Sequence, residues 1–150
     1  MTGELNYEVG LRTVTACPTA VVAQATTWAE FPRLWRQLLD EVYAGLRDSG
    51  LSLGCNIMLY RDDVPNVEVG VQVTGLVPQA GRVISSALPA GRVATTRHRG
   101  PYDGLGAAHQ AVLAWCAAHG HRPSGARWEI YGDWHENPGE LVTEVSYLLA

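Results

Sequence analysis

The sequence of 150 residues contains no lysine, so all 11 of its basic residues are arginine. With 15 acidic residues the formal net charge is −4. The arginines do not form one block, whereas phosphate binding requires clustered cations. We therefore expect neither nucleic acid nor an anionic membrane as the main partner.

Long hydrophobic runs are missing as well. A membrane-spanning helix needs about 20 consecutive apolar residues, and the first residues lack the basic and apolar regions of a signal peptide. The three cysteines, Cys17, Cys55 and Cys116, are far apart and odd in number. This pattern favours free thiols in a reducing compartment. We expect one cytoplasmic domain over residues 1–150, with 47% hydrophobic residues supplying its core.

The first of two helices is predicted by one apolar stripe at helical spacing. The stripe consists of Phe31, Leu34, Trp35, Leu38, Val42 and Leu46. Pro32 is compatible only with a first turn, so the helix starts near it and ends at 49–50, where Ser-Gly follows. Thr27 and Glu30 have the spacing of a capping box.

The second helix is predicted from about Gly104 to His119. Its apolar face carries Leu105, Ala108, Val112 and Trp115. Asp103 is placed to cap its start, and Gly120 is a natural residue to follow its end.

Alternating apolar and polar residues predict a strand over 67–74, and extended stretches bounded by turn residues predict the other strands. They cover an extended segment over 5–25 that is interrupted at 17–19, and the ranges 56–60, 67–74, 83–86, 92–99, 127–131 and 141–149. The pattern indicates an α+β fold made of a duplicated strand–helix–strand–strand unit, with repeats over about 5–76 and 82–150. We expect an antiparallel sheet with both helices on one face.

The two repeats are also alike in sequence. Residues 56–62 align with 127–133, which matches Met58 with Glu129 and Tyr60 with Tyr131. Two such units packed about a pseudo-two-fold axis create a junction between them. We therefore expect a small-molecule cleft at this junction.

Motifs of both halves resemble a known family. They are His98-Arg99-Gly100-Pro101-Tyr102, a following helix with Trp115, the W-E-x-Y strand within 125–131, and the stretch 31–35 of the first helix. Over nearly the whole chain this set is similar to the GyrI-like small-molecule-binding domain, the effector-binding domain of some AraC-type and multidrug-sensing MerR-type regulators.

The resemblance implies an aromatic cleft whose acidic residue pairs with lipophilic cations, and by position that residue is Glu129. The chain has no room for the DNA-binding domain of the regulators. We therefore expect a stand-alone member that does not bind nucleic acid directly.

Strand alternation places Glu129 and Tyr131 on one face of their strand, and Trp128 and Ile130 on the other. On the premise that Trp128 and Ile130 pack under the helices, we expect Glu129 and Tyr131 to face the cleft. A carboxylate among aromatic rings suits an organic cation. The alternative is that Glu129 pairs with Arg127, or with another arginine, on a solvated face.

Further ligand-binding candidates surround Glu129 in this prediction. They are Met58 and Tyr60 on the paired strand, the walls Tyr102, Tyr131 and Tyr147, the helix residue Trp35, and His98, which is placed to hydrogen-bond a strand or a ligand. We predict no metal site, because Cys116, His119 and His121 lack a fourth ligand.

Three functions fit these residues. The first is binding of a lipophilic, aromatic or cationic small molecule, for sensing, sequestration or resistance. The second, which the resemblance also implies, is hydrolysis of reactive cyclopropane-containing toxins without metal or organic cofactor. In that reaction Glu129 would activate water, and Tyr131 or Tyr102 would polarise a carbonyl. The third is docking on a protein partner through acidic loops at 62–63 and 136–140.

Overall fold

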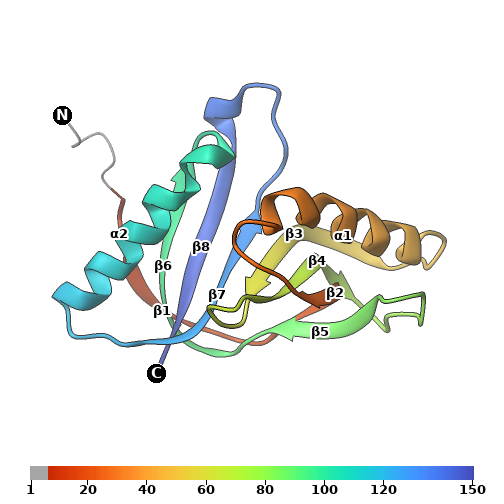
Figure 1. Cartoon of the computed structure of the whole chain (residues 1–150), viewed down its shortest axis with the longest axis horizontal. Helices are drawn as coiled ribbons and strands as arrows, with labels where there is room; N and C mark the ends of the chain where they lie inside the picture. The colour runs from red at the N-terminus through yellow and green to blue at the C-terminus, as the bar shows by residue number, and fades with distance from the viewer. Residues whose placement is uncertain (1–6) are drawn as a thin grey trace.

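The computed structural model describes residues 7–150, which form one antiparallel sheet of eight strands and two helices (Figure 1). The elements are β1 (Gly10–Val14), β2 (Cys17–Ala25), α1 (Phe31–Leu46), β3 (Ser52–Tyr60), β4 (Asn66–Thr74), β5 (Ile84–Leu88), β6 (Gly91–Arg99), α2 (Leu105–Ala118), β7 (Pro123–Tyr131) and β8 (Val142–Leu149), with short 3-10 turns η2 (Tyr102–Gly104) and η3 (Pro138–Glu140). The predicted α+β class is confirmed.

The two halves have the same order of elements, two strands followed by a helix and two strands. They meet where β3 pairs with β7, and there Met58 lies opposite Glu129. These two residues also match in the internal alignment. A pseudo-two-fold axis therefore passes through the Met58–Glu129 pair.

The halves also exchange their first strands. β1 pairs with β6 of the second half, and β5 pairs with β2 of the first. Val14 lies opposite Gly91 and Cys17 opposite Leu88, so the register continues unbroken from one pairing to the other. Each half thus completes the sheet of its neighbour.

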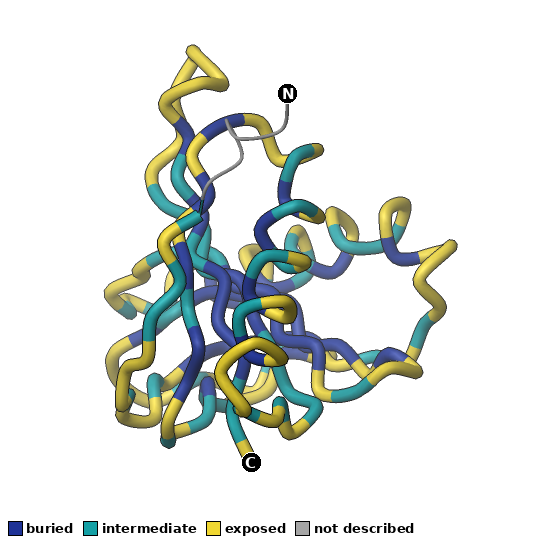
Figure 2. Tube along the Cα trace, turned by 90° about the vertical axis from the view of Figure 1, so that its left-hand side faces the viewer, coloured by how far each residue is buried: buried dark blue, intermediate teal, exposed yellow. Residues whose placement is uncertain are grey.

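Both helices pack on one face of the sheet, the face that carries Met58 and Glu129. The α1 core includes Met58 and Tyr60, and the α2 core includes Val145, which lies opposite Glu129. In Figure 2 the buried stretches gather in the central strands, while the helices are buried on one side and exposed on the other.

The other face of the sheet has a core of its own. Trp128 is 2% exposed there and packs with Leu88 and Val93, with Ile130 beside it. The prediction that Trp128 and Ile130 pack under the helices is therefore wrong. The segments β1–β2 and β5–β6 cover this face, to which they contribute Val14, Cys17, Leu88 and Val93.

The helix boundaries largely follow the predicted patterns. Phe31 begins α1 with proline in its first turn, but the helix ends at Leu46, before the predicted 49–50. Thr27 Oγ1 accepts the Glu30 N–H at 3.1 Å, which is one half of the predicted capping box. In the described chain neither helix is long and apolar enough to cross a membrane.

The end of α2 follows the prediction, but its start does not. Gly120 follows the helix with φ +72°, as a C′ glycine does. The Asp103 cap is wrong: Gly104 is the cap residue, without a side-chain hydrogen bond, because Asp103 lies inside η2.

The first predicted strand interruption is also misplaced. β2 begins at Cys17, so the break lies at 15–16 and not at 17–19. Pro18 is the second residue of β2 and lies opposite Ala87 of β5, while pairing with β4 starts only at Thr19. Proline is tolerated near the start of a strand. Residues 5 and 6 of the predicted segment lie outside the described residues.

Two glycines provide a test of this packing. A Cβ at Gly70 would overlap the backbone carbonyl of Ala20 on β2, whereas a Cβ at Gly106 in α2 meets nothing within 4 Å. Gly70→Ala should lower the free energy of unfolding by about 3 kcal/mol or more, because backbone cannot yield as a side chain can. Gly106→Ala should raise it by about 0.5–1 kcal/mol. Urea unfolding of both variants checks this, and equal effects would contradict the strand pairing.

Candidate functional site

The carboxylate of Glu129 is the centre of a buried hydrogen-bond cluster on the helix-covered face. The side chain comes from β7, and the residue is 5% exposed. The hydroxyl of Tyr60 donates to Oε1 at 3.0 Å, and the hydroxyl of Tyr131 donates to the same oxygen. The ring of His109 lies with Nε2 2.7 Å from Oε2. Three donors therefore meet a group that, when ionised, only accepts.

His109 is the member of this cluster that the sequence analysis missed. Its Nε2 lies 2.7 Å from Oε2 of Glu129, and its Nδ1 lies 2.8 Å from the hydroxyl of Tyr147. The ring thus connects α2 with β7 and β8. A signal was present, because His109 stands four residues after Leu105 and three before Val112, on the predicted apolar face.

The predicted residues nearest to Glu129 do come together. Met58 lies opposite Glu129 in the ladder, and its sulfur lies 3.4 Å from the Tyr131 hydroxyl. Tyr60 contacts the same sulfur at 3.8 Å. Tyr147 joins the cluster through His109. The carboxylate therefore has phenols on both sides and a thioether across the strand.

Three more aromatic rings pack against these phenols. Trp28 packs on Tyr60 with ring centroids 5.4 Å apart, and Phe31 meets the same ring edge-on. Tyr102 packs edge-on against Tyr131 at 5.5 Å. Trp28 is 46% exposed and Tyr102 41%. The outer rings of the cluster are therefore partly exposed to solvent, and Trp28 was not among the predicted residues.

Arg127 does not neutralise Glu129. Its guanidinium lies 2.8 Å from the Asp63 carboxylate and stacks 5.3 Å from the centre of the Trp28 ring. Among the ion pairs of residues 7–150, Glu129 has a histidine partner and no arginine. Glu68, buried on the opposite face, does pair with an arginine. The alternative of an exposed Glu129–Arg127 pair is therefore wrong.

Burial fixes the protonation of the surrounding phenols. Burial and then the adjacent Glu129 charge raise the pKa of Tyr60 and of Tyr131 well above the ordinary value of 10.0. Burial raises the pKa of Tyr147 to about 12, although Arg127 acts in the opposite direction. All three hydroxyls therefore remain hydrogen-bond donors at neutral pH.

Two predicted ligand-binding residues are engaged elsewhere. Trp35 is half-buried against the α1 core. His98 is buried on β6, where Nδ1 lies 2.8 Å from the Tyr7 hydroxyl and Nε2 lies 2.8 Å from the Pro101 carbonyl oxygen. Since a carbonyl oxygen only accepts, Nε2 donates and a neutral ring accepts from Tyr7. His98 therefore holds the chain at the entry to α2.

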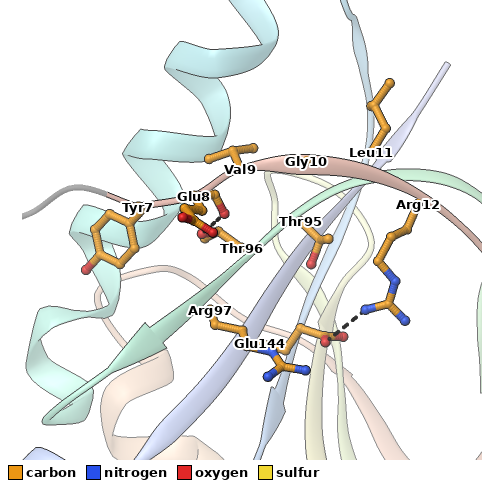
Figure 3. A pocket seen from close by; sticks show the side chains of 10 residues that line it. All are labelled: Tyr7, Glu8, Val9, Gly10, Leu11, Arg12, Thr95, Thr96, Arg97 and Glu144. Carbon is orange, nitrogen blue, oxygen red and sulfur yellow. Dashed lines mark hydrogen bonds and ion pairs between the residues drawn. The ribbon is translucent and has the colours of Figure 1, made fainter.

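Two surface hollows lie away from Glu129. One, of about 530 Å³, lies beside β1 and β6, where Arg12 and Glu144 form an ion pair of 3.3 Å (Figure 3). The other, of about 540 Å³, lies on the solvent side of α1. The Glu129 carboxylate itself is closed over by the side chains described above.

The sequence was compared with known protein families and with curated proteins. The family model of the GyrI-like small-molecule-binding domain matches residues 7–148. The chain belongs to this family. No curated protein matches the sequence.

Solved structures share the fold of this GyrI-like domain. The crystal structure of the EcmrR C-terminal domain superposes with a TM-score of 0.79 at 22% identity, over 96% of this chain and 98% of that one. The structure of SAV2435 bound to tetraphenylphosphonium has a TM-score of 0.71 at 12% identity, over 95% and 94%. A hydrolase encoded by lin2189 from Listeria innocua has a TM-score of 0.64 at 10% identity, over 95% and 92%.

The raised phenol pKa values predict how stability depends on alkaline pH. Because the folded pKa of Tyr147 exceeds the unfolded value, its contribution to stability is complete below pH 10 and is lost as pH rises towards 12. No lysine titrates in this interval. The free energy of unfolding should therefore fall between pH 10 and 12, and less steeply in Tyr147→Phe. Urea unfolding across this range measures the slope, and equal slopes in both proteins would contradict the burial of this phenol.

Proposed function

We propose that this GyrI-like domain binds lipophilic aromatic cations at Glu129, and thereby serves in sensing, sequestration or drug resistance. The observation that carries the proposal is a buried carboxylate that is held by two phenols and His109, has no arginine partner among the described residues, and is surrounded by aromatic rings. Burying a carboxylate is costly unless an opposite charge accompanies it. A cation with aromatic substituents supplies that charge together with apolar surface.

The surrounding side chains have distinct parts in this proposal. Glu129 supplies charge, and Tyr60, Tyr102, Tyr131 and Tyr147 supply aromatic faces for cation–π contact. Met58 is a polarisable, adaptable neighbour. Trp35 and His98 have supporting parts in this proposal. Trp35 packs in the α1 core, and His98 holds the chain at the entry to α2.

The structural neighbours support this ligand class. One of them, SAV2435, is described as bound to tetraphenylphosphonium, a lipophilic cation with four aryl groups. Another, the EcmrR C-terminal domain, shares the fold over nearly its entire length. We keep from the sequence the predictions of a cytoplasmic location, a single domain and no direct contact with nucleic acid.

Charge recognition by Glu129 can be tested with a matched ligand pair, methyltriphenylphosphonium and neutral triphenylphosphine oxide. Glu129→Gln keeps the shape of the side chain and removes its charge. The variant should bind the phosphonium at least about tenfold more weakly, while its affinity for the oxide changes less than about threefold. Isothermal titration calorimetry measures both constants.

Glu68→Gln is the matched control for this experiment. Glu68 is also 5% exposed, but it lies on the other face of the sheet and pairs with Arg61. Its variant should bind the phosphonium like the wild type once its melting temperature shows that it is folded. Equal loss of both ligands in Glu129→Gln would contradict recognition of charge.

Hydrolysis is the second candidate function, and the Glu129–His109 pair favours it. In this reaction Glu129 accepts a proton from water while the water oxygen bonds to a cyclopropane carbon. The ring C–C bond breaks, and its electron pair moves to the conjugated carbonyl, which Tyr131 or Tyr102 polarises. The ring-opened product then takes up a proton, so water is added in net terms and no cofactor takes part. Two of the neighbours are described as hydrolases from Listeria innocua.

Mass spectrometry distinguishes hydrolysis from binding. Incubation with electrophilic cyclopropane-containing aromatics should give a product heavier by one water if the protein is a hydrolase, and Glu129→Gln should abolish it. Compounds that are retained by the protein and returned unchanged would exclude turnover and support binding.

A further inference from the structure

The two halves of the domain place an exposed aromatic ring at matching positions. Trp28 lies three residues before Phe31, where α1 begins, and Tyr102 lies three residues before Leu105, where α2 begins. The connections from β2 to α1 and from β6 to α2 have the same length. The pseudo-two-fold axis therefore relates the indole of Trp28 to the phenol of Tyr102.

The rings beneath them obey the same relation. Trp28 packs on Tyr60 and Tyr102 packs on Tyr131, with ring centroids 5.4 and 5.5 Å apart. The hydroxyls of both inner phenols donate to one oxygen of Glu129. Each half thus contributes a pair of packed rings, an exposed ring over a more buried one, with a tilted contact at Tyr60 and an edge-on contact at Tyr131. Both pairs, called stacks below, converge on a single carboxylate.

The stacks approach Glu129 from opposite sides. Tyr60 lies opposite Arg127 in the ladder, two residues before Glu129, and Tyr131 lies two residues after it. At about 3.3 Å per strand residue, these ends of the segment are roughly 13 Å apart. Trp28 is fixed at its end by a hydrogen bond of 3.1 Å to the Asp63 carbonyl oxygen.

From this arrangement we infer that the ligands of the site carry two aryl groups on a central cationic atom, with Trp28 holding one group and Tyr102 the other. The inference rests on the proposed function and specifies its ligand class. One aryl group can use only one stack. Two aryl groups on one centre engage both stacks, so the second contact forms within the complex and adds to the affinity of the first.

Phosphonium ions of constant charge test the inference. The probes are trimethylphenylphosphonium and dimethyldiphenylphosphonium, titrated by calorimetry into the wild type, Trp28→Ala and Tyr102→Ala. In the wild type the second phenyl should raise the affinity about tenfold. Either variant should reduce this gain to about twofold. The single-phenyl ion should lose no more than about twofold in either variant, because the remaining stack still accepts it.

Tyr43→Ala is the matched control, since Tyr43 is 40% exposed at the far end of α1 and bonds to Asn56. This variant should keep the wild-type gain. The inference is overturned if Trp28→Ala weakens both ions by the same factor, or if neither variant changes the gain. If the ions bind and require Glu129 but show no such gain, this inference alone fails. If neither ion binds the wild type, the proposed function fails with it.

Discussion

The burial of the Glu129 carboxylate is the constraint on which the arrangement of the site depends. A carboxylate 5% exposed must be supplied with donors or with an opposite charge. The donors come from three elements, Tyr60 on β3, Tyr131 on β7 and His109 on α2. Each of these three side chains lies within hydrogen-bond distance of the carboxylate. Glu129 therefore connects α2 with both halves of the sheet. The same burial strengthens its attraction for a cation, because the local dielectric constant is low.

The two halves of the domain contribute equivalent aromatic rings to the site. Its acidic and imidazole groups, in contrast, occur in one half only. Both halves contribute a phenol and an exposed ring in front of it. At the axis, however, a carboxylate on one strand faces the thioether of Met58 on the other. The helices differ likewise, since His109 stands four residues into α2 where Trp35 stands four residues into α1. The pseudo-symmetric fold thus contains a single carboxylate at its axis, Glu129, with the imidazole of His109 beside it.

Local patterns in the sequence predicted much of this structure. The alternation through Glu129 and the internal alignment with Met58 and Tyr60 placed these side chains on one face, because strand geometry and register are encoded within a few residues. The apolar stripe of α1 located that helix to within a few residues. The resemblance in the family motifs implied that Glu129 is the acidic residue of the predicted site.

The features that the sequence did not predict depend on contacts between segments far apart in the chain. Alternation separates the faces of a strand but does not say which face a helix covers, so Trp128 was assigned to the wrong core. The pairing of β1–β2 with β5–β6, which covers Trp128, joins residues 63 to 85 positions apart. His109 gave only a weak signal in the alanine-rich α2, and its partner Tyr147 lies 38 residues away. The equivalence of Trp28 and Tyr102 follows only from the equal lengths of the two loops, which are known once the strand and helix boundaries are known.

A crystal structure of the domain with methyltriphenylphosphonium tests the central claim most directly. The account predicts the phosphorus atom in front of the Glu129 carboxylate, with its phenyl groups against Trp28 and Tyr102. Phosphonium bound elsewhere, for instance in the hollow beside β1 and β6, with the Glu129 cluster closed and unchanged, would contradict it.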